Sequence, residues 1–240
     1  MMVIGFDGSR AFNKDKTGTE NYSYQLLKAL AKIDQKNTYI VYLRLRSNGT
    51  EKWSKNFKFV TIKWLKLWTQ VGLAKQTFQD KLDVLFIPAH TIPLIHKPNL
   101  KTVVTVHDLG SEYLPKMHQL KQRLYLKWIT HYQLKHANKL IAPSKATKED
   151  LVKKVGIDSS KIEVIYEGID RNLFKPDLKS NRFRQYYLFV GTIQPRKNLQ
   201  RIIKAVGLTG ENLVIVGSKG WLADDIYKLP KKLGIEKKVK

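Results

Sequence analysis

Short apolar runs alternate with longer amphipathic stretches along the whole chain. In the N-terminal part, runs rich in Val, Ile, Leu, Phe and Tyr predict strands at residues 3–6, 38–43, 57–62, 84–87, 102–106, 139–142 and 161–165. Apolar residues at helical spacing predict helices at residues 22–33, 64–81, 118–137 and 145–155. Strands that alternate with helices indicate an α/β fold with parallel sheets built from β-α-β units.

The same pattern starts a second time near the C-terminal end. Residues 170–184 contain a proline and many charges but little periodicity. After them come a strand at 186–190, a helix at 197–206, a strand at 213–216 and a helix at 221–233. We therefore expect an N-terminal domain of residues 1–170, a linker of residues 171–185 and a second domain of residues 186–240. Two strands and two helices are few for an open α/β sheet, so we expect the second domain to be incomplete, with residues 236–240 leading into a third strand.

Composition narrows the function classes. The 240 residues include 44 Lys and Arg against 20 Asp and Glu, a net charge of +24. Such a charge attracts nucleic acid or an acidic lipid surface, but lysines spread over solvated faces would give the same number. The chain has no cysteine, which excludes disulfides, thiolate zinc sites and cysteine nucleophiles. The start MMVIGFDGS predicts a first strand and not a signal peptide, and no apolar run reaches the ~20 residues of a membrane span. We expect a cytoplasmic protein, either soluble or peripheral on the inner face of the membrane.

The stretch VGTIQPRKN, residues 190–198, carries the clearest candidate chemistry. An apolar strand ends at Gly191, and Arg196 and Lys197 follow at the expected start of a helix. Free backbone N–H groups and the helix dipole favour a phosphate there, Gly191 allows close approach, and the two cations add charge-assisted hydrogen bonds. The alternative is a helix whose first turn is basic by chance, at a small electrostatic cost.

Weaker candidates lie in the first domain. Gly18 and Thr19 occupy the loop after the first strand, where Thr19 could cap the next helix and Gly18 could lie against a ligand, although these residues taken alone favour an ordinary turn. His107 follows an apolar strand and could serve in hydrogen bonding or acid–base chemistry, or be a structural histidine. The expected helix at 118–137 mixes cations with Leu, Trp and Tyr, as an interfacial or a core-packed helix would.

The sequence motifs of several other nucleotide-binding and metal-binding sites are absent. No GxGxxG, GxxxxGK[ST], HExxH or DxD sequence occurs, so a dinucleotide fingerprint, a P-loop and a metal site have no support.

Five segments, taken in order, resemble the retaining glycosyltransferases of family 4, which have two facing Rossmann-like domains (the GT-B fold). The segments are TGTENYSYQLLKAL, DVLFIPAHTIPL with VVTVHDL, IAPSKATKEDLVKKVGIDSSKIEVIYEGID, VGTIQPRKNLQRIIKAV and LVIVGSKGW. The resemblance implies transfer of a hexose, with mannose as the first choice, from a nucleotide sugar to a lipid-linked or polysaccharide acceptor. GDP-mannose would be the first choice of donor, and the first domain would face the acceptor.

The resemblance also implies roles for single residues. Arg196, Lys197 and Gly191 would hold the donor diphosphate, so that protein cations stabilise the leaving group and no metal or other cofactor is needed. His107 matches the family histidine near the transferred sugar. Gly18 matches the loop glycine beside the ligand, with Thr19 next to it. Glu167 stands where the family often has asparagine, and no role is carried over to it.

One part of the family pattern lies beyond these residues. The family's second domain continues into a segment with a pair of glutamates that bind the donor, which residues 186–240 do not contain. We expect the 240-residue chain alone to be inactive, and a second chain could complete the site. A non-catalytic binding remnant, or one half of a split transferase, is the alternative. A nucleic-acid-binding protein ranks last, since no motif of that class is present.

Overall fold

The computed structural model describes residues 1–14, 16–44, 52–64, 66–89, 91–109, 131–176 and 185–240. Their contacts divide the chain into two compact units, Met1–Ile169 and Asp170–Lys240. Most of the basic helix expected at 118–137 falls outside the described residues, although residues 131–136 are helical.

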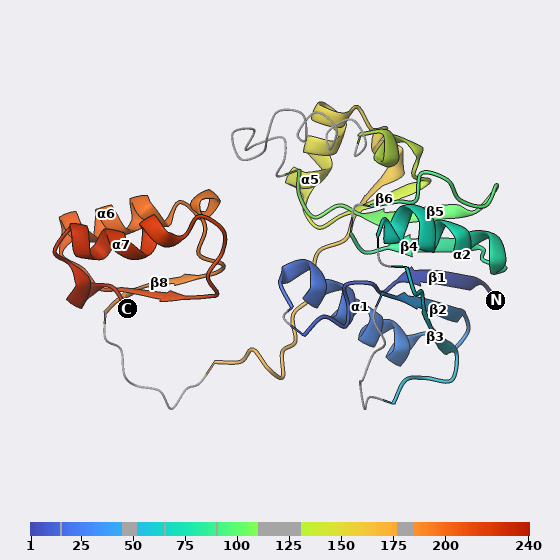
Figure 1. Cartoon of the computed structure of the whole chain (residues 1–240), viewed down its shortest axis with the longest axis horizontal. Helices are drawn as coiled ribbons and strands as arrows, with labels where there is room; N and C mark the ends of the chain where they lie inside the picture. The colour runs from blue at the N-terminus through green and yellow to red at the C-terminus, as the bar shows by residue number, and fades with distance from the viewer. Residues whose placement is uncertain (15, 45–51, 65, 90, 110–130, 177–184) are drawn as a thin grey trace. The chain divides into compact units, whose positions relative to one another are not determined.

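Unit 1 is built on a seven-stranded parallel sheet (Figure 1). Its strands are β1 (Val3–Asp7), β2 (Thr38–Leu43), β3 (Phe57–Thr61), β4 (Val84–Ile87), β5 (Lys101–Thr105), β6 (Lys139–Ala142) and β7 (Ile162–Val164). They lie in the order β3-β2-β1-β4-β5-β6-β7, so the direction of winding reverses between β1 and β4. This is the doubly wound α/β arrangement predicted from the sequence.

Helices cover both faces of this sheet because its strands are apolar on both sides. On one face, Leu27 of α1 (Gly18–Ile33) packs with Phe6 and Val41. On the other face, Leu85 and Val104 belong to a core that includes residues of a π-helix (Trp68–Leu73), which leads into α2 (Ala74–Gln79). The same core contains Leu151 and Val155 of a π-helix (Leu151–Val155), which continues α5 (Lys145–Asp150) and is followed by a 3₁₀ turn (Ser159–Lys161).

The helix expected at 64–81 is shorter than predicted. It begins only at Trp68, because Leu67 adopts the left-handed conformation with φ of 51°, which a helix cannot continue through. It ends at Gln79, since Asp80 is extended.

Unit 2 contains two parallel strands, β8 (Tyr187–Val190) and β9 (Leu213–Val216). A 3₁₀ turn (Pro195–Lys197) precedes α6 (Leu199–Thr209), and α7 (Asp224–Lys232) follows β9. Both helices lie on the same side of the strands (Figure 1), and their apolar residues form a separate core with Leu213 and Ile193.

The end of unit 2, where the sequence predicted the approach to a third strand, pairs with β9. After a 3₁₀ turn (Glu236–Lys238), Val239 pairs in parallel with Leu213 of β9. The N–H group of Lys240 donates to the carbonyl of Leu213, and its own carbonyl accepts from Ile215.

Candidate active site

The carboxyl ends of β1, β2 and β4 form a pocket of about 440 Å³ in unit 1. Its lining consists of residues that end or follow these strands, together with the start of α1 and the π-helix: Asp7, Ser9, Arg10, Asn13, Glu20, Arg44, Leu67, Trp68, Thr69, Gln70, Ala89 and Thr91. β1 and β4 are the two neighbours between which the winding reverses. Ligands of doubly wound sheets bind at this position, outside the carboxyl ends of the strands.

Charged groups of both signs line the pocket. Asp7 is buried and accepts a hydrogen bond from the Ser9 N–H group at 3.0 Å; burial raises its pKa, while the Ser9 bond and Arg10 act against the rise. Arg10 Nη1 lies 3.2 Å from Glu20 Oε1. Burial tends to raise the pKa of Glu20, but the hydrogen bond from Thr17 and the charge of Arg10 outweigh it and lower that pKa. With carboxylates beside guanidinium groups, and amides and hydroxyls around them, the pocket suits an uncharged polyhydroxyl ligand.

Gln70 holds the loop that follows β4. Its Nε2 donates to the Ile92 carbonyl at 3.0 Å, and its Oε1 accepts from the Leu94 N–H group at 2.8 Å. Gln133 Nε2 donates to the same Ile92 carbonyl at 2.7 Å. The loop is therefore fixed beside the pocket by two buried or partly buried carboxamides.

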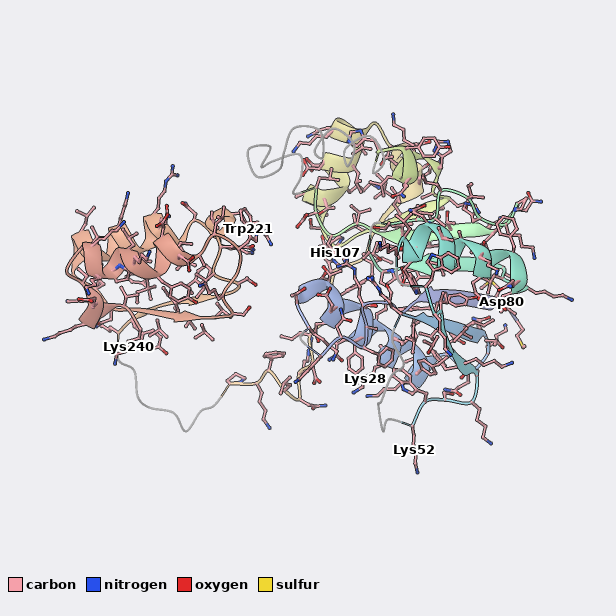
Figure 2. All side chains as sticks on the ribbon, viewed as in Figure 1. Lys28, Lys52, Asp80, His107, Trp221 and Lys240 are labelled. Carbon is pink, nitrogen blue, oxygen red and sulfur yellow. The ribbon has the colours of Figure 1, made fainter. Side chains whose placement is uncertain are left out.

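His107 lies just beyond the end of β5, toward the end of unit 1 opposite Asp80 (Figure 2). Its Nε2 is 2.9 Å from the Pro88 carbonyl oxygen and its Nδ1 is 3.1 Å from Glu167 Oε1. The ring of Tyr22 packs edge-on against it with centroids 4.7 Å apart, and the Tyr22 hydroxyl lies 3.2 Å from Thr105 Oγ1. The histidine side chain is thus fixed from three directions.

Gly18 begins α1 at the same edge of the sheet. Gly18 and Tyr22 are four residues apart and lie on one face of the helix, so the contact of Tyr22 with His107 brings the first turn of α1 near the histidine. No heavy atom outside its neighbours lies within 4 Å of the position that a β-carbon on Gly18 would take. The structure therefore brings Gly18 and His107 to one edge, with open space at the glycine.

Thr19 does not cap α1, contrary to the sequence-based expectation. The N-cap is Thr17, whose backbone is extended, and its N–H group donates to Glu20 Oε2 at 3.2 Å. The Thr17 hydroxyl also bonds to Glu20. Glu20 stands three residues after Thr17, which is the capping-box spacing, whereas Thr19 already lies inside the first turn.

Arg196 and Lys197 lie in unit 2, in the 3₁₀ turn that precedes α6. The predicted helix start at Lys197 is therefore two residues too early. The N–H groups of Lys197 and Asn198 close the turn by donating to Gln194 and Pro195 at 3.0 Å each. Asn198 is left-handed, with φ of 58°, and separates the turn from α6. Both cationic side chains are exposed at the carboxyl end of β8, as expected, but on a turn and not on the helix itself.

Gly191 belongs to a tightly bonded pair of loops. It has φ of 151°, a conformation that side chains disfavour, and its N–H group donates to Val216 of β9 at 2.9 Å. The next loop residues are joined in the same way: Ile193 donates to Ser218, and Gly220 donates to Ile193, at 2.9 Å each. The loop that carries Arg196 and Lys197 therefore starts from a fixed base.

Sequence reasoning gave no role to Asp7, Gln70 or Glu167. Asp7 had a usable signal, because a polar residue directly after a buried strand lies at the ligand-binding edge of a parallel sheet. Gln70 and Glu167 had none, since their roles depend on contacts with residues distant in the sequence.

Two further features are absent from the described parts of the chain. No three His, Asp or Glu residues there are grouped closely enough to hold a metal ion. No helix among the same residues has the length and apolar character needed to cross a bilayer.

A doubly wound domain followed by a second parallel β-α-β unit is the arrangement of the GT-B glycosyltransferases, and solved structures agree. The chain resembles Anabaena Alr3699/HepE in complex with UDP-glucose with a TM-score of 0.64 and 18% identity, covering 100% of this chain and 68% of that chain. It also resembles the apo form of the lipopolysaccharide outer core galactosyltransferase WaaB, with a TM-score of 0.58 and 17% identity over 100% of this chain and 67% of that one. At such identities the likeness shows the fold, and the predicted GT-B architecture is confirmed.

The family follows from the sequence comparison. The profile of Glycosyltransferase Family 4 matches residues 16–173, and the chain belongs to this family, as its resemblance predicted. The O-antigen chain mannosyltransferase RfbU of Salmonella typhimurium is 28% identical over 152 residues, 62% of this chain and 40% of that protein. A Campylobacter jejuni N-acetylgalactosaminyltransferase acting on a diphospho-undecaprenol-linked sugar is 26% identical over 186 residues, 75% of this chain and 49% of that protein. The chain spans less than half the length of these curated relatives.

Proposed function

We propose that this chain supplies the acceptor-side domain, and the beginning of the donor-side domain, of a hexosyltransferase. The enzyme would move a hexose, with retention, from a nucleotide sugar to a lipid-linked or polysaccharide acceptor. The observation that carries the proposal is the pocket at the reversal between β1 and β4, which lies on the same edge of the sheet as His107. The match to the family 4 profile supports the same class of enzyme.

In this proposal the pocket takes the sugar end of the acceptor. Its carboxylates and guanidinium groups, with the neighbouring amides and hydroxyls, offer donors and acceptors to hydroxyl groups of a sugar. His107 lies near the transferred hexose, and Gly18 leaves room for a ligand at the start of α1.

Arg196 and Lys197, with Gly191 behind them, bind the donor diphosphate. Negative charge develops on the diphosphate as the glycosidic bond breaks, and fixed cations that stabilise this charge lower the barrier without a bound metal. GDP-mannose remains the first choice of donor, supported by mannosyltransferases among the relatives. The UDP-glucose complex of a structural neighbour makes UDP sugars the alternative.

The acceptor chemistry suggests where the enzyme works. A lipid-linked acceptor lies in a membrane, and a chain with a net charge of +24 is attracted to acidic lipid. We therefore place the enzyme in the cytoplasm, peripherally on the inner face of the membrane. The 240-residue chain alone is proposed to be inactive until further residues or a second chain complete the donor site.

Nucleotide-sugar binding by the purified chain tests this function. Titration calorimetry with GDP-mannose and UDP-glucose should detect weak binding that falls about tenfold or more in Arg196→Ala and in Lys197→Ala, because charged hydrogen bonds to the diphosphate are lost. Arg201→Ala, an exposed cation on α6, is the matched control and should bind as the unaltered chain does. Equal binding by all variants would contradict the diphosphate assignment.

A transfer assay completes the test. Radiolabelled hexose should not reach a lipid-linked acceptor with the 240-residue chain alone. Turnover under these conditions would contradict the inactivity while supporting the enzyme. Failure to bind either donor would favour the non-catalytic binding module.

A further inference from the structure

We infer that Glu167 is a positioning residue that holds His107 as a doubly protonated, positively charged ring. The inference concerns the protonation of the histidine in unit 1, and it rests on the proposed function only for the statement that a sugar donor lies nearby. It follows from the two groups that face the two ring nitrogens.

The first group is the Pro88 carbonyl, 2.9 Å from His107 Nε2. A backbone carbonyl oxygen can only accept a hydrogen bond, so Nε2 must carry a proton for this contact to be favourable. The strand β4 ends at Ile87, directly before Pro88, and holds this carbonyl against the side chain that follows β5.

The second group is the Glu167 carboxylate, 3.1 Å from His107 Nδ1. The Glu167 side chain is 51% exposed, and a solvated carboxyl group is ionised at neutral pH, which makes it an acceptor only. Nδ1 must then also carry a proton. A neutral ring has one N–H group and would place the lone pair of its other nitrogen against an acceptor, whereas the imidazolium satisfies both contacts.

Tyr22, a further neighbour of the ring, is compatible with this charge. Tyr22 packs against the ring, and its hydroxyl is directed to Thr105. Burial raises the pKa of Tyr22, the Thr105 hydrogen bond acts against the rise, and the charge of Glu167 adds to it, so the phenol stays neutral beside the ring. Asp108, adjacent in the chain, is a further titratable group.

The arrangement limits what His107 can do in the proposed transfer. With both ring nitrogens already protonated, no lone pair is available to remove a proton from an acceptor hydroxyl. His107 instead places a fixed positive charge at the carboxyl edge of the sheet in unit 1, with its two N–H groups held by Pro88 and Glu167. We therefore assign it an electrostatic role, set by Glu167, and not that of a general base.

Histidine side-chain NMR tests the inference without any activity measurement. In long-range ¹H–¹⁵N spectra of the whole chain near pH 7, His107, identified by its loss in His107→Gln, should show two protonated ring nitrogens. In Glu167→Gln the ratio of charged to neutral ring should fall about two- to fivefold, the range expected for a partly exposed ion pair. Glu163→Gln, which removes an exposed carboxylate from β7, is the matched control and should leave the ratio unchanged.

Two outcomes would overturn the inference: a singly protonated His107 ring in the unaltered chain, or the same ratio in Glu167→Gln. Backbone amide spectra of the variants separate either result from a loss of folding. Because the readout involves no nucleotide sugar, a failed donor-binding experiment would leave this result standing, and the reverse also holds.

Discussion

Gly217 packs its Cα against the carbonyl group of Gly191, so closely that an added β-carbon would lie 1.9 Å from the carbonyl oxygen. Gly217→Ala must therefore push apart the loops after β8 and β9. We expect it to lower the free energy of unfolding of unit 2 by about 3 kcal/mol, the upper range for overpacking. Hydrogen exchange of the β9 amides measures the loss, and amides of unit 1 should exchange as before.

Gly207→Ala is the control for this substitution. Gly207 lies inside α6, where the nearest atom to an added β-carbon is Ile235 Cδ1 at 3.4 Å. Alanine is the better helix former, so this variant should be neutral or more stable by up to about 1 kcal/mol. Equal destabilisation by both changes would mean that the close approach at Gly217 is not rigid.

Replacing Asp7 by asparagine should stabilise unit 1 at neutral pH. The pKa of Asp7 in the folded protein is raised above its ordinary value of 3.8, chiefly by burial. Folding therefore favours the protonated form, and the stability associated with Asp7 is present below pH 3.8 and is lost as the pH rises through the folded-state pKa. The asparagine side chain carries no charge at any of these pH values and avoids this loss.

Thermal unfolding of the Asp7→Asn variant between pH 4 and pH 8 provides the measurement. The difference in Tm from the unaltered chain should be small at the acid end and grow with pH. A difference that shrinks as the pH rises would contradict the buried, destabilising carboxylate. Greater stability with weaker acceptor binding would fit the general trade-off between stability and function at active sites.

The cap of α1 can be tested with two neighbouring threonines. Thr17→Ala removes the hydroxyl of the capping box and should lower the free energy of unfolding of unit 1 by about 1 kcal/mol. Thr19→Ala should change it by a few tenths at most, since Thr19 lies within the helix. Urea unfolding of both variants measures these changes in the free energy of unfolding. A larger decrease for Thr19→Ala than for Thr17→Ala would support Thr19 as the cap, as expected from the sequence.

Gln70→Ala should loosen the loop beside the pocket. The variant removes the acceptor of the Leu94 N–H group, a bond of about 1 kcal/mol, so exchange of that amide should accelerate about fivefold. Gln133→Ala is the comparison, because Gln133 bonds to the Ile92 carbonyl and not to the Leu94 amide. Unchanged exchange in Gln70→Ala would show that the loop is held by other contacts.

Much of the fold could be read from the sequence because buried parallel strands appear as short apolar runs between amphipathic helices. β4 and β6 agree with their predicted ranges residue for residue. Helix starts were less accurate, because single backbone angles decide them. Neither the left-handed conformation of Leu67 nor the 3₁₀ turn that separates Lys197 from α6 has a pattern of its own.

The residues of the candidate site also divide into those that could be predicted from the sequence and those that could not. His107 and Gly18 could be proposed from their positions after a strand and before a helix, and Arg196 and Lys197 from their charge. The partner of His107 could not be predicted, because Glu167 is 60 positions away in the sequence. Only the neighbouring ends of β5, β6 and β7 bring the two residues together. The roles of the proposed site residues stay predictions until donor binding is measured.

The strand order of unit 1 has a consequence for synthesis. β2 pairs with β1, β3 with β2, β4 with β1, and each later strand with the one made before it. Every strand after β1 therefore finds a partner already present when it leaves the ribosome, and the sheet can grow outward from its first strand pair. Glu167 comes after the last of these strands, so its contact with His107 is among the last that unit 1 can form.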